Sequence, residues 1–235
     1  MDMVESGGPL GPLSTLIGAG GPVVVILLAM SVLTVAVVLA KVVQFAVLRI
    51  GDTKPVRAGL ASYRAGNHSE AIALLRGTRN PAAQVTADAI DRLPAAGHRT
   101  DLLREEIGRR AADALENLRS HLRTIEVVAT LSPLLGLFGT VLGMIEAFQA
   151  MESAGNQVDP AVLSGGIWEA LLTTAVGLAI AVPAVAAVNY LDRRVEQVTH
   201  VMEDAITQVF TASLAETSGT SHAAANSAAV AQAAA

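Results

Sequence analysis

The sequence lacks cysteine altogether and contains few aromatic residues, with one Trp, two Tyr and four Phe among its 235 residues. The absence of cysteine excludes disulfides and thiolate-ligated metal sites. The scarcity of aromatic residues argues against a membrane β-barrel, which carries aromatic girdles at both interfaces. Charged residues make up only 16% of the chain, against about 25% in a typical soluble domain. Together these deficits favour a membrane protein built from helices.

Hydrophobic residues make up 52% of the chain, and they are concentrated in three stretches. The first covers residues 23–48 and includes Lys41, the second covers 127–148 and the third covers 170–191. Each is near the roughly 20 residues that cross the hydrocarbon core of a bilayer. At this length only a helix satisfies its own backbone in lipid. The sequence therefore predicts an all-α membrane protein with three transmembrane helices and long cytoplasmic helical extensions.

The sixteen Lys and Arg residues all fall on one side of this topology. Fourteen lie between Lys41 and Arg123, and the other two are Arg193 and Arg194. The segments 1–22 and 149–167 contain none. Because basic residues that flank a span stay in the cytoplasm, we expect the N-terminal segment and the 149–167 loop to be external and the C-terminus to be cytoplasmic. A cleaved signal peptide needs a basic region before its apolar core, so the first span is expected to remain as an anchor.

The polar parts of the chain are expected to be mostly helical. The cytoplasmic region 49–126 begins with three short helical patterns, which cover 57–64, 69–76 and 81–93. A long helix is then predicted from Asp101 into the second span without a break, because only Gly108 interrupts the pattern before Pro133. The third span is expected to continue as a cytoplasmic helix over 192–215. The Ala/Ser/Asn-rich end, 216–235, has no periodic pattern and is expected to be a disordered tail.

Small residues and prolines mark the second and third spans. Gly136, Gly139 and Gly143 form a stripe along the second span, and such residues let helix backbones approach closely in lipid. This stripe is no phosphate-binding loop, since no Lys follows the glycines and no strand precedes them. Pro133 removes a backbone hydrogen bond and is expected to bend the helix. The third span carries a comparable pair, Gly177 and Pro183.

Four polar side chains in these spans are candidates for moving protons. Glu169 opens the third span beside Trp168. A carboxylate at membrane depth often lines a cavity or a proton path, although it is equally a candidate interface residue next to a belt tryptophan. Thr140, Thr173 and Thr174 carry the only hydroxyl groups deep in the second and third spans. Threonines in apolar helices also bond their own i−4 carbonyl groups, so a purely local role stays open.

The second and third spans contain no Asp, His, Lys or Arg. A proton path through the bilayer centre therefore needs an oligomer and a partner that supplies the central acid. No nucleophile–base pair and no set of metal ligands occurs within the spans, so no enzyme activity, cofactor or metal is expected. The net charge of −5 gives no indication of nucleic-acid binding.

Two blocks resemble the signature of the MotA/TolQ/ExbB proton-channel family. The first reads Leu131-Ser132-Pro133-Leu134-Leu135-Gly136-Leu137-Phe138-Gly139-Thr140-Val141, and the second reads Gly166-Ile167-Trp168-Glu169-Ala170-Leu171-Leu172-Thr173-Thr174-Ala175-Val176-Gly177-Leu178, followed by Ala181-Val182-Pro183-Ala184 and Asn189. The resemblance covers about sixty residues. It implies an ExbB-like or TolQ-like subunit of a motor in the bacterial inner membrane, which makes the external segments periplasmic. Flagellar stator subunits of the family have four spans, so that branch fits less well.

The resemblance also implies partners and roles. In the family, a homopentamer surrounds a dimer of a single-span ExbD or TolR subunit, whose transmembrane Asp carries the proton. Proton flow drives TonB-dependent outer-membrane transport or the Tol–Pal system. The run Gly-Ile-x-Glu-Ala-Leu-Leu-x-Thr-Ala at 166–175 inclines the assignment to ExbB, with TolQ or a non-conducting scaffold as alternatives. The pore threonines of the family fall on Thr140 and Thr174, and its glutamate falls on Glu169. Helical geometry places Glu169 above Thr173 and about 140° from Thr174, which leaves Thr173 as a competitor.

Overall fold

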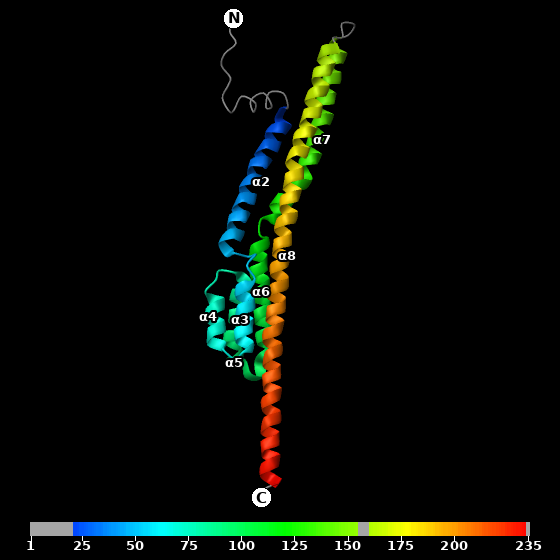
Figure 1. The fold of residues 1–235 in the computed structure, drawn as a ribbon. Coiled ribbons are helices and arrows are strands. Elements are labelled where there is room, and N and C mark those ends of the chain that lie inside the picture. The colour runs from blue at the N-terminus through cyan, green and yellow to red at the C-terminus, as the bar shows by residue number, and fades with distance from the viewer. Residues whose placement is uncertain (1–20, 155–159, 234–235) are drawn as a thin grey trace. The chain divides into compact units, whose positions relative to one another are not determined.

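A computed structural model describes residues 21–154 and 160–233, and these residues contain seven α-helices, one short 3-10 helix and no strand (Figure 1). The all-α fold class is thus confirmed. Most of the N-terminal segment 1–22 lies outside the described residues. The helices are α2 (Gly21–Leu48), α3 (Lys54–Arg64), α4 (His68–Arg76), α5 (Pro81–Ala96), η1 (Gly97–Arg99), α6 (Thr100–Arg119), α7 (Leu122–Ala154) and α8 (Pro160–Ala233).

By its internal contacts the chain divides into two units. The apolar unit consists of residues 1–41 and 121–191, and it holds most of α2, all of α7 and the first part of α8. The polar unit consists of residues 42–120 and 192–235, which include the end of α2, the helices α3 to α6 and the rest of α8. Two helices, α2 and α8, therefore contribute to both units.

Among the described residues, three helical segments are long and apolar enough to cross a membrane: Gly21–Leu48, Leu122–Ser153 and Leu163–Ser213. They contain the stretches 23–48, 127–148 and 170–191 that the sequence predicted as spans. The connection between α7 and α8 is shorter than the predicted loop 149–167, because α7 continues to Ala154 and α8 begins at Pro160. The residues between them, 155–159, lie outside the described part of the chain.

The prediction of one unbroken helix from Asp101 into the second span is wrong. Helix α6 ends at Arg119, and α7 begins at Leu122. Between them Ser120 is extended, with φ −49° and ψ 141°, and His121 has φ 63°. The Ser120 hydroxyl donates a 2.8 Å hydrogen bond to the Asn117 carbonyl oxygen. Serine competes with helical bonding in this way, and histidine is enriched at positive φ, so two residues without Gly or Pro end the helix.

The continuation of the third span through 192–215 agrees with the structure, in which α8 runs unbroken to Ala233. The tail differs from the prediction, since 216–233 is helical rather than disordered. Alanine has the highest helix propensity of all residues, and Gly219 is the sole glycine after residue 215, where there is no proline. Composition without periodicity was therefore a poor guide to disorder here.

The polar unit has a hydrophobic core of its own. Leu60 of α3, Leu75 of α4, Ile90 of α5 and Ile107 of α6 are buried, and so is Met202 of α8. Burying each such side chain contributes roughly 1.5–3 kcal/mol. The Tyr63 hydroxyl donates a 3.4 Å hydrogen bond to the Val209 carbonyl oxygen, so α3 and α8 are joined by a polar contact as well.

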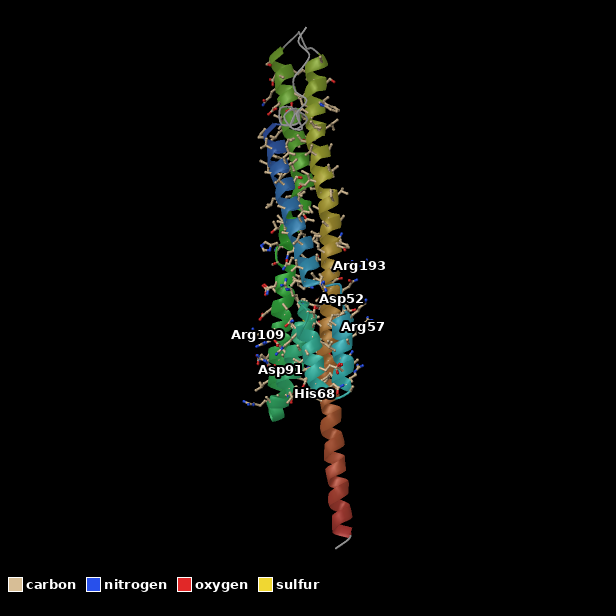
Figure 2. The ribbon with its side chains drawn as sticks, turned by 60° about the vertical axis from the view of Figure 1, so that its left-hand side comes forward. Asp52, Arg57, His68, Asp91, Arg109 and Arg193 are labelled. Carbon is tan, nitrogen blue, oxygen red and sulfur yellow. The ribbon has the colours of Figure 1, made fainter. Side chains whose placement is uncertain are left out.

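Charged residues connect the helices of the polar unit at its surface. Arg92 of α5 pairs with Glu106 of α6 at 2.6 Å, and Arg110 pairs with Asp88 of α5 at 2.8 Å. The hydrogen bond from Arg92 lowers the pKa of Glu106 below its ordinary value. Arg76 of α4 pairs with Asp91 at 2.7 Å (Asp91 is labelled in Figure 2). These contacts remain partly or fully exposed to solvent, so each adds little on its own to the stability of the bundle.

Candidate functional site

Helices α7 and α8 run side by side in the apolar unit (Figure 1), and small residues form their contact. We call this contact the glycine seam. Its members on α7 are Gly136, Gly139 and Gly143, and on α8 they are Gly166, Ala170, Thr173 and Gly177. A Cβ atom placed on Gly177 would lie 2.5 Å from the Ser132 carbonyl oxygen, and one on Gly143 would lie 3.0 Å from the Ala170 Cβ. The glycine stripe therefore packs within one copy of the chain.

Thr173 fills the middle of the glycine seam. Its side chain is only 3% exposed. Its hydroxyl lies 2.7 Å from the Ala170 carbonyl oxygen and 3.2 Å from the Gly136 carbonyl oxygen. A hydroxyl has one proton to donate, so the two carbonyl groups share it. A Cβ on Gly139 would lie 2.8 Å from the Thr173 Cβ, which explains why α7 has glycine opposite this threonine.

Thr174 lies at the edge of the glycine seam and is partly exposed. Its hydroxyl donates a 3.0 Å hydrogen bond across to the Gly136 carbonyl oxygen. Thr173 and Thr174 of α8 thus contact the same carbonyl group of α7, that of Gly136. The difference between them is accessibility, because Thr173 is buried and Thr174 is not.

Thr140 stays on its own helix. Its hydroxyl donates a 2.6 Å hydrogen bond to the Leu137 carbonyl oxygen, and its side chain is partly exposed. In a single copy of the chain, Thr140 therefore shows the local role that the sequence left open, a hydrogen bond to a carbonyl group of its own helix. A further role needs water or a neighbouring chain at its exposed side.

Glu169 lies beside a third helix. Its Oε1 atom is 3.9 Å from the position that a Cβ on Gly21 would take, at the first residue of α2. The N-terminus of a helix carries a partial positive charge that favours a carboxylate. Glu169 thus borders α2, whereas Thr174 contacts α7. Among the described residues no hydrogen bond links Glu169, Thr140 and Thr174 directly.

The two prolines occupy different surroundings. Pro133 lies inside α7 next to buried Ser132, whose carbonyl oxygen faces Gly177. Pro183 lies inside α8 and lines an apolar groove of about 440 Å³ between α2 and α8, together with Ser31 and Thr34. Only Pro133 is therefore next to the glycine seam.

Large apolar side chains cover the outside of α7 and α8. Leu134, Leu137 and Phe138 of α7 are each more than half exposed, as are Leu171 and Val182 of α8. A water-soluble monomer rarely shows a continuous apolar surface of this kind. Lipid tails or neighbouring membrane helices suit it.

Sequence reasoning missed two features of the site. It did not find Gly166, although Gly166, Ala170, Thr173 and Gly177 share the spacing of one helix face, which would have extended the stripe by a turn. It also missed the closeness of Glu169 to Gly21. No spacing rule could have found this contact, because it joins residues 148 positions apart.

The model of the MotA/TolQ/ExbB proton channel family matches residues 77–204, which is more than half of the chain and includes the whole glycine seam. The chain belongs to this family. Its members are proton channels rather than enzymes, as expected from the spans. The match begins directly after α4, so it covers α5, η1 and α6 as well as the second and third spans.

Curated relatives of both ExbB and TolQ type resemble the chain. The biopolymer transport protein ExbB1 of Vibrio cholerae is 44% identical over 87 residues, which cover 35% of this chain and 38% of that protein. The Tol-Pal system protein TolQ of Haemophilus influenzae is 43% identical over 84 residues, covering 36% of each chain. An ExbB-like putative biopolymer transport protein of Synechocystis is 31% identical over 166 residues, covering 70% of this chain and 77% of that one. The chain thus spans little more than a third of the first two relatives.

Proposed function

We propose that this chain is the proton-channel subunit of an inner-membrane motor of the ExbB–ExbD type, which couples the proton motive force to TonB-dependent outer-membrane transport. The observation that carries the proposal is the polar edge of the glycine seam. There the Thr174 hydroxyl lies at the partly exposed rim of two packed spans. Hydroxyl groups both donate and accept protons without holding a charge, which suits a path that must not trap the proton.

The proposed channel needs more than one chain. Neither α7 nor α8 supplies an acid at the centre of its span, since Glu146 and Glu169 both lie near the end of a span. The exposed apolar faces of α7 and α8 offer surfaces to neighbouring copies. We therefore propose a homopentamer around a dimer of a single-span ExbD/TolR-like subunit, whose transmembrane Asp supplies the missing acid, with a TonB-like protein as the coupled partner. The proposed pathway residues are Glu169, Thr140 and Thr174, with Thr173 as the competitor.

The choice of ExbB over TolQ rests on the run at 166–175, since relatives of both types match the chain almost equally well. Deletion of the gene in its own organism distinguishes the two. The ExbB proposal expects loss of TonB-dependent uptake with an intact outer membrane. A leaky outer membrane with normal uptake would favour the TolQ-type alternative.

The proton-channel proposal is tested by proton flux into liposomes that contain the chain and its single-span partner. An imposed potential of 100 mV supplies about 2.3 kcal/mol per proton. We expect flux only when both proteins are present, and we expect Glu169→Ala to abolish it while the complex remains assembled by native mass spectrometry. Flux that persists at the wild-type level in Glu169→Ala would remove this carboxylate from the path. No flux from the complete wild-type complex would favour the non-conducting scaffold.

The proposed orientation places 1–22 and the α7–α8 connection in the periplasm, and the polar unit and C-terminus in the cytoplasm. Because the chain has no cysteine, single cysteines report their side cleanly. We expect Ser153→Cys, at the exposed end of α7, to react with an impermeant thiol reagent in intact spheroplasts. We expect Ser69→Cys, on the exposed face of α4, to react only after lysis. The opposite pattern would invert the topology.

A further inference from the structure

A cavity of about 870 Å³ opens in the polar unit at the point where α2 ends. Its walls come from the last turn of α2, the following loop, the start of α3 and the end of α4. Its volume falls in the range of roughly 300–1,000 Å³ that is usual for small-ligand sites. The cavity has no part in the glycine seam, and the proposed proton path does not use it.

The charge around this cavity is positive. Arg49, Lys54 and Arg79 line it, against one carboxylate, that of Asp52. Within the described part of the chain, the structure shows none of these three basic side chains in an ion pair. Asp52 already accepts a 3.1 Å hydrogen bond from the backbone N–H of Lys54, at the start of α3. The cavity thus keeps an excess of positive charge that no described group of the chain neutralises.

The loop that carries Arg49 is held in place. The buried side chain of Asn80 donates hydrogen bonds to the carbonyl oxygens of Arg49, at 3.1 Å, and Asp52, at 3.0 Å. Arg49 has a φ of 48°, in the left-handed region, which costs energy for a residue other than glycine. Asn80 therefore fixes a strained turn that sets Arg49 in the wall of the cavity, and Asp52 lies in the same loop (Figure 2).

The other wall of the cavity is apolar and continues along α2. Val47 of the last turn lines the cavity and is half exposed, and Val43 one turn earlier is 60% exposed. Leu74 of α4 adds a further exposed apolar side chain. Since α2 is a candidate span, its last turn lies where hydrocarbon gives way to headgroups. A ligand here meets basic side chains at one end and an apolar helix face at the other.

We infer that this cavity binds the phosphate-bearing headgroup of an anionic membrane lipid, whose acyl chains lie along the exposed face of α2. Arginine and lysine near a membrane surface attract anionic lipids, and arginine matches the geometry of a phosphate through paired hydrogen bonds. A zwitterionic lipid would bring its own cation close to Arg49, Lys54 and Arg79 and bind less well. The inference requires only that α2 spans the membrane, so it stands apart from proton conduction.

Native mass spectrometry of the purified full-length chain tests the inference, with phosphatidylglycerol and phosphatidylcholine titrated separately in the same detergent. We expect phosphatidylglycerol to bind at least about tenfold more tightly. The triple variant Arg49→Gln/Lys54→Gln/Arg79→Gln should lose this preference. The matched control Arg57→Gln/Arg99→Gln/Arg104→Gln removes the same charge from exposed positions outside the cavity and should keep it. Arg57 is labelled in Figure 2.

A second variant keeps all three basic residues. Ala58 is an exposed wall residue of the cavity, and Ala58→Glu places a competing carboxylate there, so it should also lower phosphatidylglycerol binding. If circular dichroism shows that the triple variant does not fold, lipid binding to Ala58→Glu decides the test. Equal losses in the cavity and control triples, equal binding of both lipids, or unchanged binding in Ala58→Glu would overturn the inference. Displacement of the lipid by equimolar glycerol phosphate would assign the site to a soluble phosphate instead.

Discussion

Gly177→Ala is expected to force α7 and α8 apart and to lower the apparent melting temperature of the chain by about 6–12 °C. The new Cβ would lie 2.5 Å from the Ser132 carbonyl oxygen and 3.2 Å from the Gly136 Cα. Both atoms belong to the backbone of α7, so no side-chain rotation relieves the clash. Overpacking of this kind typically lowers the free energy of unfolding by 1–3 kcal/mol. Because the neighbours here are backbone atoms, which cannot move aside alone, we expect a loss of about 3 kcal/mol or more.

Gly165→Ala is the matched control for this prediction, because it makes the same change on the same helix. A Cβ on Gly165 meets nothing within 4 Å. Alanine is the better helix former by about 1 kcal/mol, so the control should melt at or slightly above the wild-type temperature. Thermal unfolding of both variants in detergent, followed by circular dichroism, gives the comparison. Coincident curves for the two variants would show that α7 and α8 are not packed through Gly177.

The glycine seam also shows what the sequence alone predicts well. The stripe of Gly136, Gly139 and Gly143 followed from spacing, and spacing fixes which face of a helix its members share. Spacing says nothing about the helix on the other side. The structure places α8 there, with Thr173 opposite Gly139 and Ala170 opposite Gly143. The positions of the candidate spans were also predicted well, because the thickness of the bilayer sets the length of an apolar stretch.

Two kinds of feature were not predicted from the sequence. One is a helix break that local backbone chemistry sets, and the other is the contacts between helices far apart in the chain. The break at Ser120 and His121 contains no glycine or proline that would have indicated it in the sequence, and one hydroxyl–carbonyl hydrogen bond accompanies it.

The relation of Glu169 to Thr174 was predicted as an angle of about 140° on one helix. That angle is consistent with the structure, in which Glu169 borders α2 and Thr174 contacts α7. Which of these faces meets a pore depends on neighbouring chains, which a single sequence does not describe.

Thr140→Val/Thr174→Val is expected to lower proton flux in reconstituted liposomes by at least about tenfold, equivalent to 1.4 kcal/mol in the barrier. Valine has nearly the shape of threonine but can neither donate nor accept a proton. Both threonines are partly exposed and so are open to water or to a partner's acid, and Thr174 lies at the rim of the seam. The single variant Thr174→Ser keeps a hydroxyl at this position and should keep the proton flux. A purely packing role predicts instead that the near-isosteric valine variant keeps normal flux.

Thr173→Val separates the competitor from Thr174. The Thr173 side chain is 3% exposed, and its hydroxyl already bonds the Ala170 and Gly136 carbonyl oxygens inside the seam. We therefore expect this variant to lose about 0.6–1.7 kcal/mol of stability, as for hydrogen bonds between membrane helices, while its flux stays near wild type. Thr34→Val controls for hydroxyl loss in general, because the Thr34 hydroxyl donates a 2.8 Å hydrogen bond to the Met30 carbonyl oxygen of its own helix, α2. Normal flux in Thr140→Val/Thr174→Val together with lost flux in Thr173→Val would move the path into the seam. There the Gly136 carbonyl oxygen, which accepts from both neighbouring threonines, would become the next group to test.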